Sequence, residues 1–151
     1  MDVVMMQIGH GLQLGQSGDR AAARRELAEV WRRIGREAGD PLHRCALAHA
    51  MADGQEDVRD ELVWDLRALE AADAISDERA SGAGLSSARA LYPSLHLNLG
   101  ECYRKVGDLD RAREQLRRGQ SAVAALADDG YGQMIRGGLD RLAERLGSAT
   151  S

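Results

Sequence analysis

The chain has 151 residues, 44% of them hydrophobic and 29% charged, which is typical of one soluble globular domain and argues against disorder. Its formal net charge of −4 argues against a nucleic-acid-binding protein, which needs a basic surface to neutralise phosphates. No apolar run approaches the roughly 18 residues of a membrane span, and Asp2 stands where an export signal would carry positive charge, so we expect a cytoplasmic protein. Cys45 and Cys102 lie far apart without CxxC spacing, which predicts two buried free thiols.

Apolar residues recur three or four positions apart along the chain, and no window alternates long enough to indicate a strand. Asp19 and the pair Asp40-Pro41 are typical of helix starts, and any helix that begins before Pro93 should kink there. We therefore predict an all-α fold of roughly seven helices in a single domain over 1–147. The expected parts are helix pairs at about 1–38, 40–80 and 86–127, a capping helix at 130–147, and a disordered tail at 148–151.

An internal repeat organises this pattern. The stretch Gly11-x2-Leu14-x3-Gly18-Asp19-x3-Ala23-Arg24-x2-Leu27 recurs as Gly100-x2-Tyr103-x3-Gly107-Asp108-x3-Ala112-Arg113-x2-Leu116, with every matched position 89 residues further on. We expect the Gly-Asp pair to form the turn and cap of each second helix, and the small residues to let helices approach closely.

These motifs resemble the tetratricopeptide repeat (TPR), a helix-turn-helix unit of ~34 residues with a Leu-Gly-x2-Tyr … Ala-x3-Phe pattern. The segment Leu99-Gly100-x2-Tyr103 carries the strongest likeness, and the chain is similar to the helical-repeat proteins of bacteria. The resemblance implies a right-handed α-solenoid of about three antiparallel helix pairs, the middle one degenerate. It also implies a non-catalytic module that binds a peptide or protein segment in a concave groove.

The helix that contains the strongest copy carries the expected contact residues. Asn98, Glu101, Arg104 and Lys105 combine an amide, an acid and two bases on one predicted exposed face, and an amide can pair with a peptide backbone as both donor and acceptor. In kinesin-light-chain-like repeats an Asn at the matching place binds peptide, so the resemblance implies this role for Asn98. A solvated polar face that binds nothing is the alternative.

On the preceding repeat, His49 and Asp53 are four residues apart and should share one helix face that flanks the groove. A hydrogen bond on the helix surface is the alternative. A zinc site needs three or four converging ligands, and none is visible, so we expect no metal and no cofactor.

The first helix is apolar on the side opposite its expected packing face. Val4, Met5, Ile8 and Leu12 lie there, which predicts a patch covered by a second copy of the chain or by a partner. Coverage by later helices of the same chain is the alternative.

Enzyme motifs are not present: there is no nucleophile elbow, phosphate loop, HExxH or dinucleotide fingerprint. The sequence therefore predicts a protein-interaction module. Two alternatives are a structural homodimer formed through the first helix, and a small-ligand or metal sensor that uses His10, His43, His49 and His96.

Overall fold

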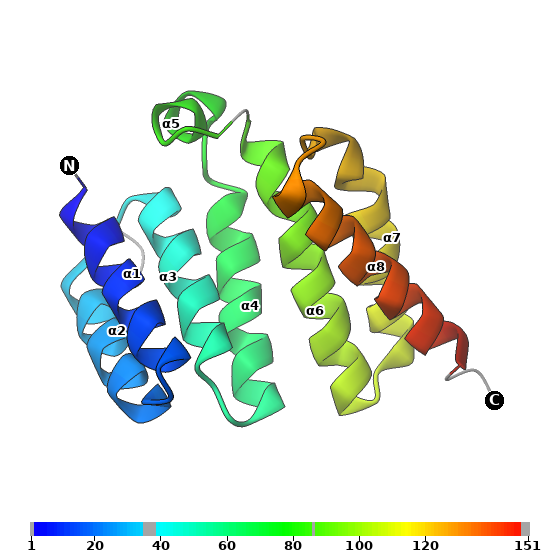
Figure 1. Cartoon of the computed structure of the whole chain (residues 1–151), viewed down its shortest axis with the longest axis horizontal. Helices are drawn as coiled ribbons and strands as arrows, with labels where there is room; N and C mark the ends of the chain where they lie inside the picture. The colour runs from blue at the N-terminus through cyan, green and yellow to red at the C-terminus, as the bar shows by residue number, and fades with distance from the viewer. Residues whose placement is uncertain (1, 35–38, 86, 149–151) are drawn as a thin grey trace. The chain divides into compact units, whose positions relative to one another are not determined.

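The computed structural model describes residues 2–34, 39–85 and 87–148, and within these ranges it contains helices and no strand. The expected all-α fold is therefore confirmed. The chain divides into two compact units, an N-terminal unit (Met1–Ile75) and a C-terminal unit (Ser76–Ser151), whose helices are drawn in Figure 1. No helix in the described part of the chain combines the length and the apolar character needed to cross a membrane.

Four helices build the N-terminal unit: α1 (Val3–Gln16), α2 (Arg20–Ile34), α3 (Pro41–Asp53) and α4 (Val58–Ala72). Short turns join α1 to α2 and α3 to α4, and each pair packs along its length (Figure 1). Because α3 also lies against both α1 and α2, the two hairpins share one core. The predicted end of the first pair, at residues 35–38, lies outside the described residues.

Aspartate side chains cap all four of these helices. Each accepts a hydrogen bond from a backbone N–H of the first turn, which would otherwise have no partner inside the helix. The four bonds are Asp2 to Met5 at 3.1 Å, Asp19 to Ala22 at 3.0 Å, Asp40 to Leu42 at 2.9 Å and Asp57 to Arg59 at 2.8 Å. The predicted helix starts at Asp19 and Asp40 are confirmed.

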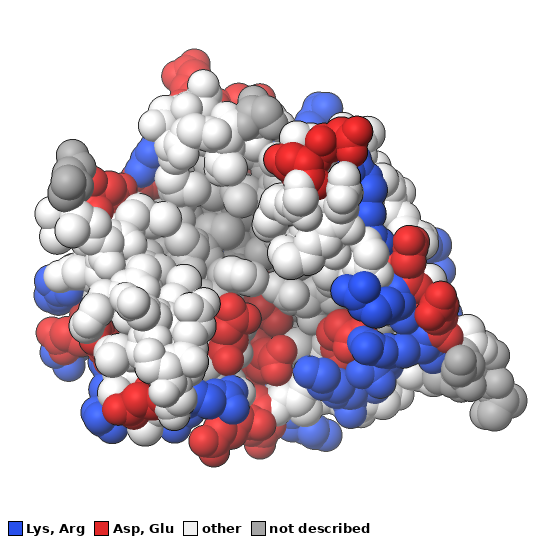
Figure 2. Space-filling model, viewed as in Figure 1, with Lys and Arg blue, Asp and Glu red and all other residues white. Residues whose placement is uncertain are grey.

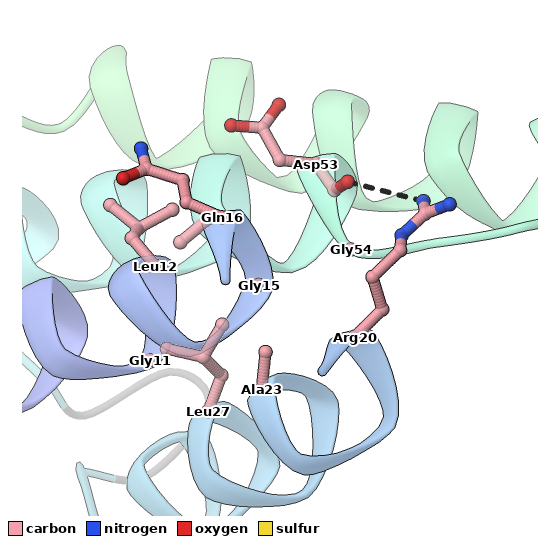
Figure 3. A pocket seen from close by; sticks show the side chains of 10 residues that line it. Gly11, Leu12, Gly15, Gln16, Arg20, Ala23, Leu27, Asp53 and Gly54 are labelled. Atoms are coloured by element: carbon pink, nitrogen blue, oxygen red, sulfur yellow. Dashed lines mark hydrogen bonds between the residues drawn. The ribbon is translucent and has the colours of Figure 1, made fainter. Parts of the chain in front are cut away.

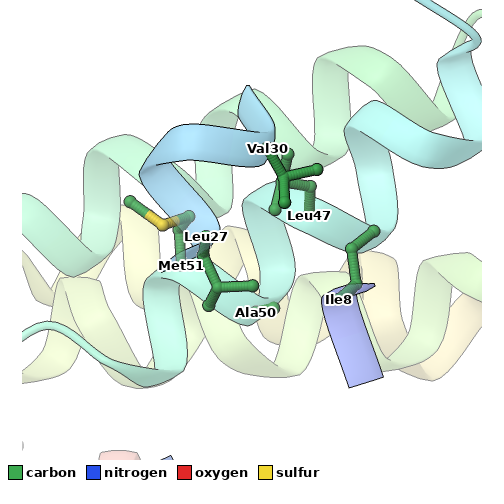
Figure 4. Packing of buried hydrophobic residues seen from close by; sticks show 6 residues of the cluster. All are labelled: Ile8, Leu27, Val30, Leu47, Ala50 and Met51. Carbon is green, nitrogen blue, oxygen red and sulfur yellow. The ribbon is translucent and has the colours of Figure 1, made fainter. Parts of the chain in front are cut away.

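The core of the N-terminal unit is built from aliphatic side chains of α1, α2 and α3. Its buried members, drawn in Figure 4, are Ile8, Leu27, Val30, Leu47, Ala50 and Met51. Beside this core, the rings of Trp31 in α2 and Trp64 in α4 meet edge to face with centroids 5.0 Å apart. The Arg67 guanidinium lies 4.4 Å from the Trp64 ring centroid, so a cation–π contact completes the cluster.

The C-terminal unit has one long hairpin and a last helix that lies against both of its members. Its elements are α5 (Asp77–Gly82), the 3₁₀ helix η1 (Ala88–Leu91), α6 (Tyr92–Val106), α7 (Leu109–Ala122), the 3₁₀ turn η2 (Val123–Ala125) and α8 (Gly130–Ser148). Before Pro93 the chain forms the short 3₁₀ helix η1, and α6 begins at Tyr92 with Pro93 in its first turn. Residues 149–151 of the expected tail lie outside the described residues.

The two matched hairpins turn in the same way. Gly18 and Gly107 both adopt a left-handed conformation, with φ of +99° and +87°, which a side chain would strain. The next residue of each, Asp19 or Asp108, caps the following helix. The backbone N–H of each aspartate also donates to a carbonyl of the preceding helix, Leu14 at 3.0 Å and Tyr103 at 2.9 Å. The turn chemistry predicted from the repeat is therefore confirmed in both copies.

The middle of the chain differs from the expected helix pair at 40–80. Helix α4 ends at Ala72, and α5 is a separate short helix that starts where Ser76 caps the N–H of Arg79 at 3.1 Å. Ser76 has extended backbone geometry, which interrupts the helical path after α4. Its side chain then caps a new helix, so α5 is separate from α4.

Candidate functional site

A cavity of about 180 Å³ opens in the N-terminal unit between α1, α2 and the end of α3 (Figure 3). Its lining is mostly small or aliphatic, with polar groups at the edge. The residues that form it are Gly11, Leu12, Gly15, Gln16, Arg20, Ala23, Leu27, Ala50, Asp53 and Gly54. We call this cavity the α1–α3 pocket.

The α1–α3 pocket is open because small residues face it from three helices. Gly11 and Gly15 are one helical turn apart on α1, and they leave that face without side chains. Ala23 of α2 and Ala50 of α3 add only methyl groups. The side chain of Leu27 closes the inner end of the pocket. It lies directly against Gly11, because a Cβ atom at Gly11 would be 2.5 Å from the Leu27 Cδ2 atom.

Two arginines hold the end of α3 beside the first hairpin. Arg24 donates to the carbonyl oxygen of Gly54 at 2.9 Å, and Arg20 donates to that of Gln55 at 2.7 Å. These carbonyls end the helix and have no partner inside it, so the guanidinium groups satisfy them and oppose the negative end of the helix dipole. These bonds fix the end of α3, which lines the pocket, to α2.

The second hairpin holds α8 in the corresponding way. Arg113, which matches Arg24 in the repeat, donates to the carbonyl oxygen of Leu146 at 3.4 Å. Helices α3 and α8 therefore take matching positions beside their hairpins, with Gly54 corresponding to Leu146.

The matched place in the C-terminal unit is filled. Leu142 lies four residues before Leu146, just as Ala50 lies four residues before Gly54. The Leu142 side chain is fully buried, and its Cδ2 atom would lie 2.6 Å from a Cβ at Gly100. In the C-terminal unit a leucine of α8 thus fills the space beside the matched glycine, whereas Ala50 of α3 leaves the α1–α3 pocket open. The small residues of each pair were expected to let its own two helices approach, and Gly100 does lie close to α7, where a Cβ would be 3.6 Å from the Ala112 carbonyl oxygen. Gly100 also admits the side chain of Leu142 from α8.

The rim of the α1–α3 pocket carries free polar groups. Figure 3 shows the Gln16 amide and the Asp53 carboxylate on the same side of the cavity, extending from α1 and α3. No described residue donates to the Asp53 carboxylate, while Arg20 is engaged with backbone carbonyls. Asp53 is also the single carboxylate of the described lining, so the pocket lacks the three or four ligands of a zinc site.

The expected patch on the first helix is largely covered by the chain itself. Ile8 is only 3% exposed and belongs to the core, and Val4 and Leu12 pack against the same cluster. For Ile8 the cover expected from a second copy or a partner comes from the chain itself, which was the stated alternative, because α3 packs on this face of α1. Met5 stays 37% exposed. Figure 2 shows the surface over α1 as uncharged on the visible face, and α1 contains no charged residue.

The predicted contact residues of α6 are largely engaged within the C-terminal unit. Glu101 accepts hydrogen bonds from Arg104 at 2.9 Å and from Arg145 of α8 at 2.8 Å. Burial alone would raise the pKa of Glu101, but these two bonds outweigh it and lower that pKa below its usual value. Asn98 is half-buried and already engaged, which leaves Lys105 as the exposed member of the set.

Helix α8 explains this engagement. Leu97, the residue before Asn98, packs on α8, and its Cδ2 atom would lie 2.6 Å from a Cβ at Gly138. On α3, His49 is half-buried and engaged, whereas Asp53 lies exposed at the pocket rim. Of the predicted site residues, Asp53 and Leu12 line the α1–α3 pocket.

Sequence reasoning missed Gln16, Arg20 and Ala50 as lining residues. The four-residue spacing of Gly11 and Gly15 was a visible signal for a bare helix face. The role of Ala50 had no such signal, because it depends on α3 and α8 taking matching positions.

Both cysteines are free and buried, as predicted. Burial raises the pKa of Cys45 to about 12, so this thiol stays protonated at neutral pH and is a poor nucleophile.

Comparisons with family models, with curated proteins and with solved structures returned no match to this chain.

Proposed function

We propose that the chain is a non-catalytic protein-interaction module of TPR-like helix pairs, and that its α1–α3 pocket receives one aliphatic side chain from a partner segment. The observation that carries this proposal is the open volume between α1 and α3: Gly11 touches Leu27 of its own hairpin, but no side chain of α3 fills the space beside it, whereas Leu142 of α8 fills the space beside Gly100. A partner's leucine or methionine would supply the missing apolar group.

Size supports this occupant. A cavity of about 150 Å³ lined by aliphatic residues can hold a benzene molecule, so the 180 Å³ of the α1–α3 pocket suits one side chain of similar bulk. Burial of a whole leucine-sized group contributes roughly 1.5–3 kcal/mol, which is enough to select among peptides.

Charge supports a basic neighbour in the partner segment. Asp53 presents an unpaired carboxylate at the rim, and the N-terminal unit has fourteen acidic residues against nine basic ones. A lysine or arginine next to the apolar anchor would pair with Asp53, and the surplus of acidic residues would speed its approach.

The test is a peptide-display selection against the full chain, followed by titration of the selected peptides with Trp31 and Trp64 fluorescence as the readout. Ala50→Leu places a side chain in the pocket as Leu142 does in the other copy. We expect selected peptides to carry an aliphatic residue beside a basic one, and Ala50→Leu to weaken binding by about ten-fold or more. Peptides that bind Ala50→Leu as tightly as the original chain would refute the proposal.

Two charge variants separate the rim from a general charge effect. Asp53→Asn should weaken the selected peptides by about three- to ten-fold, while Glu70→Gln, which neutralises an exposed acid on α4, should leave them unchanged. Asn98→Ala tests the α6 face by the same titration. If this variant alone abolishes binding, the groove expected from the TPR resemblance is the site, and the α1–α3 pocket is not.

A second candidate, self-association through α1, is favoured by its exposed N-terminal side chains. Val3 is 63% exposed and Met6 is 57% exposed, next to the partly exposed Met5. Removing the whole helix would expose the core around Ile8, so the better test is the double variant Val3→Ser and Met6→Ser. Light scattering that shows a dimer for the original chain and a monomer for this variant would support self-association.

A further inference from the structure

The C-terminal unit contains a larger cavity, of about 440 Å³, which is separate from the α1–α3 pocket. The elements η1 and η2 contact each other beside it, and the first turns of α6 and the end of α7 complete its walls. The lining residues are Ser87, Arg89, Tyr92, His96, Ser121, Ala122, Ala124 and Ala125. We call it the η1–η2 cavity. Its volume is in the range of small-molecule sites, about 300–1,000 Å³.

The charge of the η1–η2 cavity is one-sided. Arg89 is exposed and none of the described lining residues is acidic. The nearby Asp77 does not line the cavity, and its carboxylate accepts the backbone N–H of Ala88 at 3.1 Å. Arg89 therefore offers a guanidinium without a counter-charge in the wall, which is complementary to an anion.

One wall of the cavity is a pair of stacked rings. The Tyr92 and His96 rings lie 27° from parallel, with centroids 5.9 Å apart. His96 is 7% exposed, and its Nδ1 atom lies 2.7 Å from the Gln115 Oε1 atom, so this bond holds the ring in place. The wall is thus a rigid aromatic surface.

The remaining surface is small and partly polar. Ala122, Ala124 and Ala125 contribute methyl groups from the end of α7 and from η2. Ser87 precedes η1 without making a side-chain capping bond, so its hydroxyl is available beside Arg89. A flat apolar body thus has room against the tyrosine ring, with a donor pair at the cavity edge.

We propose that the η1–η2 cavity binds a small aromatic carboxylate. The carboxylate accepts hydrogen bonds from the Arg89 guanidinium and the Ser87 hydroxyl, and the ring stacks on Tyr92 over the alanine methyl groups. The planar guanidinium matches the two oxygens of a carboxylate, and the ring wall selects a flat substituent. The interaction module would then bind a small molecule in addition to a partner segment.

The experiment titrates the full chain with benzoate and follows binding by NMR shifts of the Tyr92 and His96 rings. Benzoate should give saturable shifts below about 10 mM, and benzyl alcohol, which has the ring without the charge, should bind about ten-fold more weakly. An absence of saturable shifts with benzoate would overturn the proposal. Inorganic phosphate that binds as tightly as benzoate would overturn the claim that the cavity selects a ring.

Variants locate the site. Arg89→Ala removes an exposed side chain and should weaken benzoate by about ten-fold, whereas Lys105→Ala, which removes a cation from α6 outside the cavity, should have no effect. Ala122→Leu fills the cavity and should abolish binding while Arg89 is intact. Equal binding by Arg89→Ala, or retained binding by Ala122→Leu, would show that benzoate does not occupy this cavity. If the peptide-display selection yields no ligand for the α1–α3 pocket, the benzoate experiment still tests the η1–η2 cavity, because the two cavities have different lining residues.

Discussion

Gly11 and Gly100 hold matching positions in the two copies of the repeat, yet each faces a leucine from a different helix. Leu27 comes from the second helix of the same hairpin, whereas Leu142 comes from α8. Both leucines are fully buried, and Gly11 also borders the α1–α3 pocket.

This difference predicts unequal costs for the same substitution. Gly100→Ala should destabilise the C-terminal unit by about 1–3 kcal/mol, because the new methyl group forces a buried leucine to move. Gly11→Ala should cost more, near the upper end of that range, because both the Cδ2 and the Cγ atoms of the buried Leu27 would lie 2.5 and 2.7 Å from the new methyl group. Urea unfolding measures both, with Trp fluorescence for the N-terminal unit and amide exchange in α6–α8 for the C-terminal unit. A larger loss for Gly100→Ala would contradict the prediction.

Gly15→Ala should stabilise the N-terminal unit. A Cβ at this position would lie 3.6 Å from the Ala23 Cβ, an ordinary van der Waals distance, and the helix gains about 0.5–1 kcal/mol from the exchange. The midpoint of the urea transition followed by tryptophan fluorescence should rise. Gly18→Ala is the matched control, and it should lower the midpoint, because Gly18 has a φ of +99°.

Cys45 should report opening of the N-terminal unit. Its thiol is 4% exposed and burial raises its pKa to about 12, so a disulfide reagent at pH 8 should not react with the folded chain. In the Cys102→Ala variant, labelling should begin only at urea concentrations at which the Trp31 and Trp64 fluorescence changes. Stoichiometric labelling within the mixing time in native buffer would show that the thiol is accessible.

Ionisation of the same thiol should make the stability of the N-terminal unit depend on pH in the alkaline range. The thiol of the unfolded chain ionises near its ordinary pKa of 9.0, whereas the folded one does not until about pH 12. The unfolded state therefore gains from ionisation in this window, and the N-terminal unit should lose stability as the pH rises from about 9 to 12. The loss should be smaller in Cys45→Ala, measured relative to that variant's own stability at pH 7.

Glu101 should stabilise the C-terminal unit at neutral pH and not in acid. Arg104 and Arg145 hold its pKa below the ordinary 4.5, so the contribution is complete above that value and disappears as the pH falls through the lowered one. Glu101→Gln should cost about 1–2 kcal/mol at pH 7, and the difference from the original chain should shrink below pH 4.5. Amide exchange in α6 and α8 measures it. Asp140→Asn, at an exposed position of α8, is the control and should change the stability neither at pH 7 nor below pH 4.5.

The sequence by itself determined the helices and most of their ends. The caps at Asp19, Asp40 and Asp108 and the left-handed turns at Gly18 and Gly107 depend on bonds between residues a few positions apart. Such local bonds leave a pattern in the order of residues, and the spacing of 89 positions revealed that the pattern occurs twice.

Only the tertiary structure decided which faces of those helices are covered. The periodicity of α1 shows two apolar faces, but it does not show that α3 packs over Ile8. Likewise, nothing near Ala50 or Leu142 in sequence reveals that the two occupy matching places, one leaving a pocket and the other filling it. Packing joins residues that are distant along the chain, so empty volume is a property of the assembled helices.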